Sequence, residues 1–177
     1  FNNTVATGSA CFSYGPGSTA NVNNTCEAVF TAAALAYPGT ALTTKITITN
    51  NGSVDASDLS VYMPSCTNIA TPGAPAPGGA NPCGSGGAQF YIQETDASWT
   101  PTACRFLGSN PCGFTIPSTL NTFATGASSA STALDLGVGP ARGQSRYFII
   151  GMQLPPTADN TYQGQAAQFG LTWHITS

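Results

Sequence analysis

Few residues in this chain are of the types that carry out acid–base or nucleophilic chemistry. There is one histidine, His174, and there are seven acidic residues. Glycoside hydrolysis needs two carboxyl groups about 5–10 Å apart. The acids that are close in sequence are Glu94 with Asp96 and Asp55 with Asp58. Both pairs lie beside turn-forming residues, where a carboxylate commonly accepts hydrogen bonds from the backbone.

Motifs of hydrolases and nucleotide-binding enzymes are absent from the sequence. It contains no His-Glu-x-x-His, no Gly-x-Ser-x-Gly and no Gly-x-x-x-x-Gly-Lys. His174 alternates with apolar residues on a predicted strand, which is typical of a surface position. We therefore expect that the protein is not an enzyme.

Oxygen-bearing side chains are the candidates for metal binding. Calcium takes six to eight oxygen ligands, often from Asp, Asn and backbone carbonyls on loops. Suitable clusters are Asn50, Asn51, Asp55 and Asp58, and the pair Asp159-Asn160. Turn formation explains the same residues, and no EF-hand spacing is present. No Cys-x-x-Cys pair occurs, which disfavours zinc. We expect no cofactor, and calcium is the one metal ion that the residue types allow.

Aromatic side chains are the candidates for binding sugars, because a flat ring can stack on a sugar ring. They are Tyr62, Tyr91, Trp99 and Tyr147. The three tyrosines alternate with the predicted core-facing residues of their strands. The same pattern would arise if these rings covered an outer sheet face or packed on a neighbouring subunit, since aromatic residues are common at interfaces.

The composition excludes several classes of partner. Only 6% of the residues are charged, the formal net charge is −3, and there are four Lys+Arg. Nucleic acids and anionic membranes require a basic surface, so neither is an expected partner. No run of about 20 apolar residues exists, so no membrane span is predicted. The chain begins with Phe1 rather than Met, as a processed chain does, and this fits secretion.

Six cysteines predict disulfide bonds. Many connectivities are compatible with six cysteines. Pairing of sequence neighbours is favoured because each pair brackets a segment rich in Gly, Pro or Asn: Cys11–Cys26, Cys66–Cys83 and Cys104–Cys112. An even count and low charge indicate an oxidising, extracytoplasmic setting. Sequons begin at Asn2, Asn23 and Asn51, although such triplets also arise by chance in a chain this rich in Asn and Thr.

Alternating patterns predict the strands around which these residues are arranged. The clearest runs are residues 42–49, 59–63, 89–94, 146–154 and 166–175. Asn50-Asn51-Gly52 predicts a turn between the first two runs. Residues 114–123 suggest weak strands, 27–37 are ambiguous, and 66–87 suggest a long disulfide-stapled surface loop. The pattern predicts an all-β protein, a jelly-roll-like β-sandwich over residues 10–177 preceded by a tail over residues 1–9.

Two parts of the sequence resemble the TasA and camelysin-like family. The first comprises Tyr37-Pro-Gly39, Lys45-Ile-Thr-Ile-Thr-Asn-Asn-Gly-Ser-Val54 and Leu59-Ser-Val61. The second comprises Leu154-Pro-Pro, Asp159-Asn-Thr-Tyr-Gln-Gly164 and Phe169-Gly-Leu-Thr-Trp-His174. The chain departs from the bacterial members in its six cysteines and its very low charge. Some camelysin-type members are called metalloproteases, but no zinc motif here extends that role to this chain.

The resemblance implies a secreted structural protein, a subunit of extracellular filaments such as biofilm matrix fibres or archaeal bundling pili. In such filaments the N-terminal segment of one subunit completes a sheet of the next, which is donor-strand complementation. The expected partner is therefore another copy of the chain. Candidate donor residues are Phe1, Thr4 and Val5, and candidate acceptor residues are Ile46, Ile48, Phe148 and Ile150.

Two alternatives remain open at the level of sequence. The N-terminal residues could pair within their own subunit as an ordinary edge strand. The protein could also be a monomeric cell-surface or carbohydrate-binding β-sandwich module.

Overall fold

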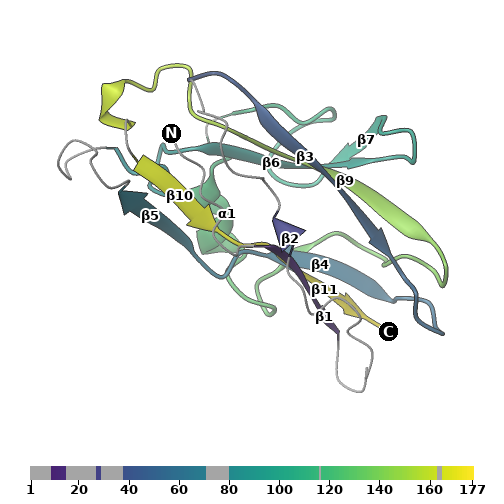
Figure 1. The fold of residues 1–177 in the computed structure, drawn as a ribbon. Helices are drawn as coiled ribbons and strands as arrows, with labels where there is room; N and C mark the ends of the chain where they lie inside the picture. The colour runs from purple at the N-terminus through teal and green to yellow at the C-terminus, as the bar shows by residue number, and fades with distance from the viewer. Residues whose placement is uncertain (1–8, 15–26, 29–37, 71–79, 116, 163–164) are drawn as a thin grey trace.

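The chain is mostly β, with one short α-helix in the part described by the computed structural model (Figure 1). The described residues are 9–14, 27–28, 38–70, 80–115, 117–162 and 165–177, and of 9–14, 27–28 and 70 only the backbone is described. Two layers of sheet face each other. The elements are β1 Ser9–Tyr14, β2 Glu27–Ala28, β3 Leu42–Thr49, β4 Asp58–Tyr62, β5 Cys66–Ala70, β6 Gln89–Thr95, β7 Pro101–Cys104, α1 Leu120–Gly126, β8 Leu134–Asp135, β9 Ser145–Gln153, η1 Asn160–Tyr162, β10 Gln165–Phe169 and β11 Thr172–Thr176.

The first layer is a four-stranded antiparallel sheet in the order β3-β9-β6-β7. Its strands alternate between an inner and an outer face, because successive side chains of a strand point to opposite sides. The inner face carries fully buried Ile48, Phe90, Ile92, Phe148 and Ile150. On β3 the outer residues are exposed throughout. This is the amphipathic pattern predicted for residues 42–49.

The second layer has the order β2-β1-β11-β4-β8. Its pairings are antiparallel except that of β1 with β11, which is parallel. A separate ladder joins β10 to β5, with Phe169 opposite Cys66, and the neighbouring ladder joins β11 to β4, with Thr172 opposite Tyr62. β5 follows β4 in the chain and β11 follows β10, so the same two chain segments, 58–70 and 165–176, form both ladders one after the other. The predicted single strand over 166–175 is interrupted at Gly170 and Leu171.

One hydrophobic core lies between the layers. Phe148 from the first layer and Trp173 from the second lie with ring centroids 4.9 Å apart, and both side chains are fully buried. A second aromatic group joins Phe90, Phe106 and Phe123, with Phe90 and Phe123 at 5.1 Å and Phe106 and Phe123 at 4.8 Å. Burial of several large rings contributes most of the favourable free energy of such a core.

The predicted turn at Asn50 is present, but its two strands do not form a hairpin. The Asn50 side chain accepts a hydrogen bond from Gly52 N and donates to Val54 O and Pro140 O, each at 2.9 Å. After the turn, β3 lies in one layer and β4 in the other. The turn therefore carries the chain across the core.

Two local predictions were wrong. Residues 120–126 form helix α1, where strands were predicted over 114–123. Thr119 Oγ1 accepts a hydrogen bond from Thr122 N, and Leu120 and Phe123, three residues apart, are both buried on the face toward the core. The segment 66–87 is not simply a surface loop. Its first residues form β5, and Pro82, Cys83 and Gly87 near its end are buried.

Both disulfides in the described part join sequence neighbours, Cys66 with Cys83 and Cys104 with Cys112, as predicted. The predicted Cys11–Cys26 pair lies outside the described residues, because Cys26 does. Disulfides persist in oxidising environments, which indicates an extracytoplasmic location.

The N-cap of α1 gives a direct test of the local account. Replacing Thr119 with Ala removes the hydroxyl that caps the helix and should lower the free energy of unfolding by about 1 kcal/mol. Thr119→Ser, which keeps the hydroxyl, should stay close to the parent. Chemical denaturation measures both, and equal stability of the two variants would contradict the role of the cap.

Candidate functional site

The start of the described chain lies beside its last strand. β1 pairs with β11 in parallel, with Cys11 opposite Thr172 and Tyr14 opposite Ile175. The N-terminal end of β1 therefore lies beside the start of β11. β10 comes directly before β11 in the chain. A segment that continued β1 in the same direction would run beside β10. This makes the β10 edge the candidate acceptor for an N-terminal strand.

The β10–β5 ladder contains a buried polar pair. Asn68 Nδ2 on β5 donates to Gln165 Oε1 on β10 at 2.8 Å. Asn68 Oδ1 is buried and has no hydrogen-bond partner among the described residues. A buried acceptor without a partner costs about 1–3 kcal/mol, so this ladder is a place where an added donor would stabilise the protein.

The donor and acceptor residues named from the sequence fall in two places. Phe1, Thr4 and Val5 lie outside the described residues. The proposed acceptors are all on the inner face of the first layer: Ile48, Phe148 and Ile150 are fully buried, and Ile46 is partly buried against the core. They line the closed interior between the layers, whereas β10 belongs to an edge ladder.

Three of the four acids considered for catalysis, Asp55, Glu94 and Asp96, have hydrogen-bond partners. Asp96 Oδ1 accepts hydrogen bonds from Ser98 N and Thr100 N in the turn between β6 and β7, each at 2.8 Å. Asp55 Oδ1 accepts from Arg142 N at 2.7 Å. In the part of the chain that the structure describes, no group of three or more His, Cys, Asp and Glu side chains could hold a metal ion.

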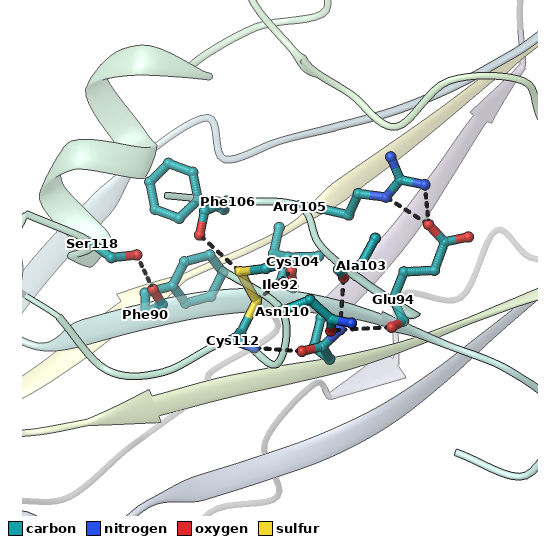
Figure 2. The surroundings of a disulfide bond; sticks show 11 residues. Phe90, Ile92, Glu94, Ala103, Cys104, Arg105, Phe106, Asn110, Cys112 and Ser118 are labelled. Atoms are coloured by element: carbon teal, nitrogen blue, oxygen red, sulfur yellow. Dashed lines mark hydrogen bonds and ion pairs between the residues drawn. A yellow bond between two sulfur atoms is a disulfide. The ribbon is translucent and has the colours of Figure 1, made fainter. Parts of the chain in front are cut away.

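Glu94 on β6 is the centre of an ion-pair cluster with Arg105 and Arg146, and Figure 2 shows its pairing with Arg105. Its Oε2 accepts from Arg105 Nε at 2.6 Å, and its Oε1 accepts from Arg146 Nε at 2.9 Å. The Glu94 and Arg146 side chains are each only 14% exposed. Arg146 on β9 also donates to Leu136 O at 2.9 Å and Val138 O at 2.8 Å, in the segment after β8. The cluster therefore joins the two layers.

Gln93, the neighbour of Glu94, holds the loop that the Cys104–Cys112 disulfide closes; Figure 2 shows this disulfide. Its Oε1 accepts from Cys112 N at 2.6 Å, and its Nε2 lies 2.7 Å from Ala103 O and 3.2 Å from Asn110 Oδ1. The side chain is 3% exposed. A glutamine on the outer face of the predicted strand 89–94 gave no sequence signal for this anchor, and sequence reasoning missed it.

Three of the four aromatic candidates share one surface. Tyr91 on β6 and Tyr147 on β9 point away from the core, and Trp99 from the β6–β7 turn contacts Tyr147 with ring centroids 5.6 Å apart. All three side chains are half-buried. Tyr62 lies on β4 in the other layer and packs against the core. The structure thus brings three of the predicted residues together.

The remaining candidates are on the surface or outside the described part. His174 is half-buried on β11, between the buried Trp173 and the half-buried Ile175 in sequence. Asn51 is exposed in the turn after β3, whereas the sequons at Asn2 and Asn23 lie outside the described residues. Asp159 Oδ1 accepts hydrogen bonds from Thr161, which lower the pKa of this exposed carboxyl.

These features define a mostly β, disulfide-bonded protein with a candidate strand-pairing edge and a candidate aromatic surface. No protein-family model matches the chain, and no curated protein matches it significantly. Within the described residues, no helix is long and apolar enough to cross a membrane.

The Glu94 cluster predicts a stability effect. Glu94→Gln leaves the partly buried Arg146 guanidinium without its carboxylate and should lower the free energy of unfolding by about 2 kcal/mol. Asp58→Asn is the matched control on β4 and should change it by less than about 0.5 kcal/mol. Urea denaturation measures both, and equal effects of the two changes would refute a special role for Glu94.

The disulfide loop makes a second prediction. Replacing Cys104 and Cys112 together with Ala should lower the free energy of unfolding by about 2–3 kcal/mol, from the loop-closure entropy of a short loop. The fold should persist, because Gln93 still holds the loop. Circular dichroism and thermal melting check this. A variant that is unfolded at 25 °C would show that the disulfide is required for the fold rather than supportive.

Proposed function

We propose that the protein is a structural subunit of an extracellular filament, and that it polymerises by donating residues 1–8 to a neighbouring copy. The proposal includes a jelly-roll arrangement of the two layers and secretion to the cell surface or extracellular matrix. The main observation in support is that β1 pairs with β11 in parallel. A strand that extended β1 toward the N-terminus would therefore lie beside β10.

The lengths of donor and edge are compatible. Eight residues precede β1, and an extended chain spans about 3.3 Å per residue, giving about 26 Å. β10 has five residues and needs about 16 Å of strand. A donated segment of this length can pair along all of β10 and still connect to β1 of its own subunit.

The composition of the donor and of the edge supports strand addition. Phe1, Thr4 and Val5 are β-compatible, and the eight residues contain no charged side chain. Pairing along β10 would form about five backbone hydrogen bonds, each with a net contribution of about 1 kcal/mol. Strand addition of this kind pairs backbone groups along a sheet edge.

Residues 1–8 could pair with β10 of a neighbouring copy (in trans) or with β10 of their own chain (in cis), and both arrangements would use the same edge of β10. Residues 1–8 of one subunit could continue β1 along their own β10. The proposal is that a neighbouring copy supplies these residues instead, so each subunit both gives and receives one strand. A contact of this head-to-tail type repeats without closing and produces a filament.

The test is electron microscopy of the full chain beside a chain that lacks residues 1–8. The full chain should form filaments and the truncated chain should not. Val5→Pro should also abolish filaments, because proline cannot donate a backbone hydrogen bond. Val5→Thr, which keeps β-branching, is the matched control and should retain them.

A synthetic peptide of residues 1–8 completes this test. Added to the truncated chain, it should raise the thermal midpoint, and a scrambled peptide should not. Filaments from the truncated chain would remove the tail from the mechanism. Monomers of the full chain at every concentration would overturn the filament itself.

A further inference from the structure

The outer face of the first layer carries an aromatic surface built from several elements. We use the term outer platform for Lys45, Tyr91, Trp99, Phe114, Tyr147 and Ile149. Tyr91, Tyr147 and Ile149 alternate with core residues on β6 and β9, and Phe114 contacts Tyr91 with ring centroids 4.8 Å apart. Lys45 is exposed on β3, and the other five side chains are half-buried, so each presents part of its surface to solvent.

Tyr91 lies over a glycine that leaves room for it. Gly151 is opposite Tyr91 in the ladder between β6 and β9. A Cβ at position 151 would overlap the Tyr91 ring. The absence of a side chain there lets the ring lie against the sheet, and burial of this half-exposed phenol raises its pKa. The position of the Tyr91 ring, at one end of the outer platform, therefore depends on the glycine at position 151.

Trp99 lies in the turn between β6 and β7, at a position whose backbone conformation favours glycine. Its φ is +67°, a left-handed conformation that is costly for residues other than glycine. Hydrogen bonds to Asp96 fix this turn: Trp99 N donates to Asp96 O at 3.0 Å, and Thr100 N donates to Asp96 Oδ1. The result is an indole held edge-on to Tyr147 at the other end of the outer platform.

Lys45 supplies the one positive charge of the outer platform, and the turn that presents Trp99 also carries the exposed carboxylate of Asp96, whose Oδ1 accepts hydrogen bonds from Ser98 N and Thr100 N. Lys45 Nζ lies 4.6 Å from the centroid of the Trp99 ring. Among the described residues no carboxylate lies within ion-pair distance of Lys45, whereas Arg105 and Arg146 both pair with Glu94. Thr43, Thr47 and Thr49 surround Lys45 on the same face of β3 and are exposed. The ammonium group is thus available to an anionic ligand beside stacked rings and hydroxyl groups.

We propose that the outer platform binds an acidic, linear polysaccharide, with sugar rings stacked on Trp99 and Tyr147 and a uronic acid carboxylate at Lys45. The Tyr91 and Tyr147 positions are about 13 Å apart along the strands, from the register of β6 and β9. That distance corresponds to about two or three consecutive sugars. Nucleic acid fits less well, since it needs many phosphate contacts and the chain has four Lys+Arg.

Binding at the outer platform does not require filament formation. It concerns the outer face of β3, β9 and β6, while strand donation concerns β1 and β10 in the other layer. A filament would repeat the platform many times and strengthen binding to a long polymer. Short oligosaccharides avoid this effect, because each one occupies a single platform.

Two probes of matched length test the proposal on the full chain: an oligogalacturonate and a neutral cello-oligosaccharide. Titration calorimetry should show binding of the oligogalacturonate that is at least tenfold tighter than that of the neutral probe. The affinity should fall as salt rises, because the ion pair with Lys45 is screened. Lys45→Gln should remove most of the preference, whereas Tyr162→Ala, an aromatic change on η1, should leave it unchanged.

Fluorescence gives a readout at the site itself. The chain has two tryptophans, and Trp173 is fully buried while Trp99 is half-exposed. Oligogalacturonate should protect Trp99 from acrylamide quenching, and Trp99→Ala should lower affinity at least tenfold. If Trp99→Ala fails to fold, Gly151→Ala, which displaces Tyr91, serves as the second variant. Equal affinity for both probes, or no binding of either at millimolar concentration, would overturn the proposal.

Discussion

The structure depends on the two-sided pairing of the last strand, β11. On one side it pairs antiparallel with β4, and on the other it pairs parallel with β1. Its Trp173 is fully buried and contacts Phe148 of the opposite layer. The strand thus joins the N-terminal part of the described chain to the core. It also determines where a segment that precedes β1 can go.

Although the chain has few charged residues, several polar side chains each hold two or more segments together. Glu94 binds two of the four Lys and Arg residues and connects the layers through Arg146. Gln93 closes the Cys104–Cys112 loop, and Asn50 closes the crossing between β3 and β4. Each group has several partners, which is how a buried or half-buried polar side chain avoids the cost of desolvation. Lys45 differs from Arg105 and Arg146, because its ammonium group lies over the Trp99 ring rather than beside a carboxylate.

The sequence predicted the strands whose two faces differ in polarity. Residues 42–49 and 146–154 were identified because burial on one side produces strict alternation. It also predicted the Asn50 turn and two disulfides. It could not predict that β3 and β4 lie in different layers, since alternation specifies which face is buried but not the partner strand. Helix α1 was missed because its short apolar pattern, Leu120 and Phe123, depends on contacts made by the folded core.

The candidate sites were predictable only in part. Tyr91, Trp99 and Tyr147 were named individually, but their common surface depends on the turn that places Trp99 and on the space above Gly151. The acceptor residues predicted from the sequence line the core, whereas the register of β1 points to β10. Parallel pairing between the two ends of a chain leaves no short-range signal in the sequence.

Hydrogen–deuterium exchange of the full chain across a dilution series tests the central claim most directly. Subunits that receive a strand from a neighbour should lose protection on dilution at those amides of residues 165–169 that face away from β5, while the amides that pair with β5 and the β11 amides that pair with β4 stay protected. Protection of 165–169 that does not change with concentration would contradict donation in trans, because a strand supplied by the same chain is unaffected by dilution.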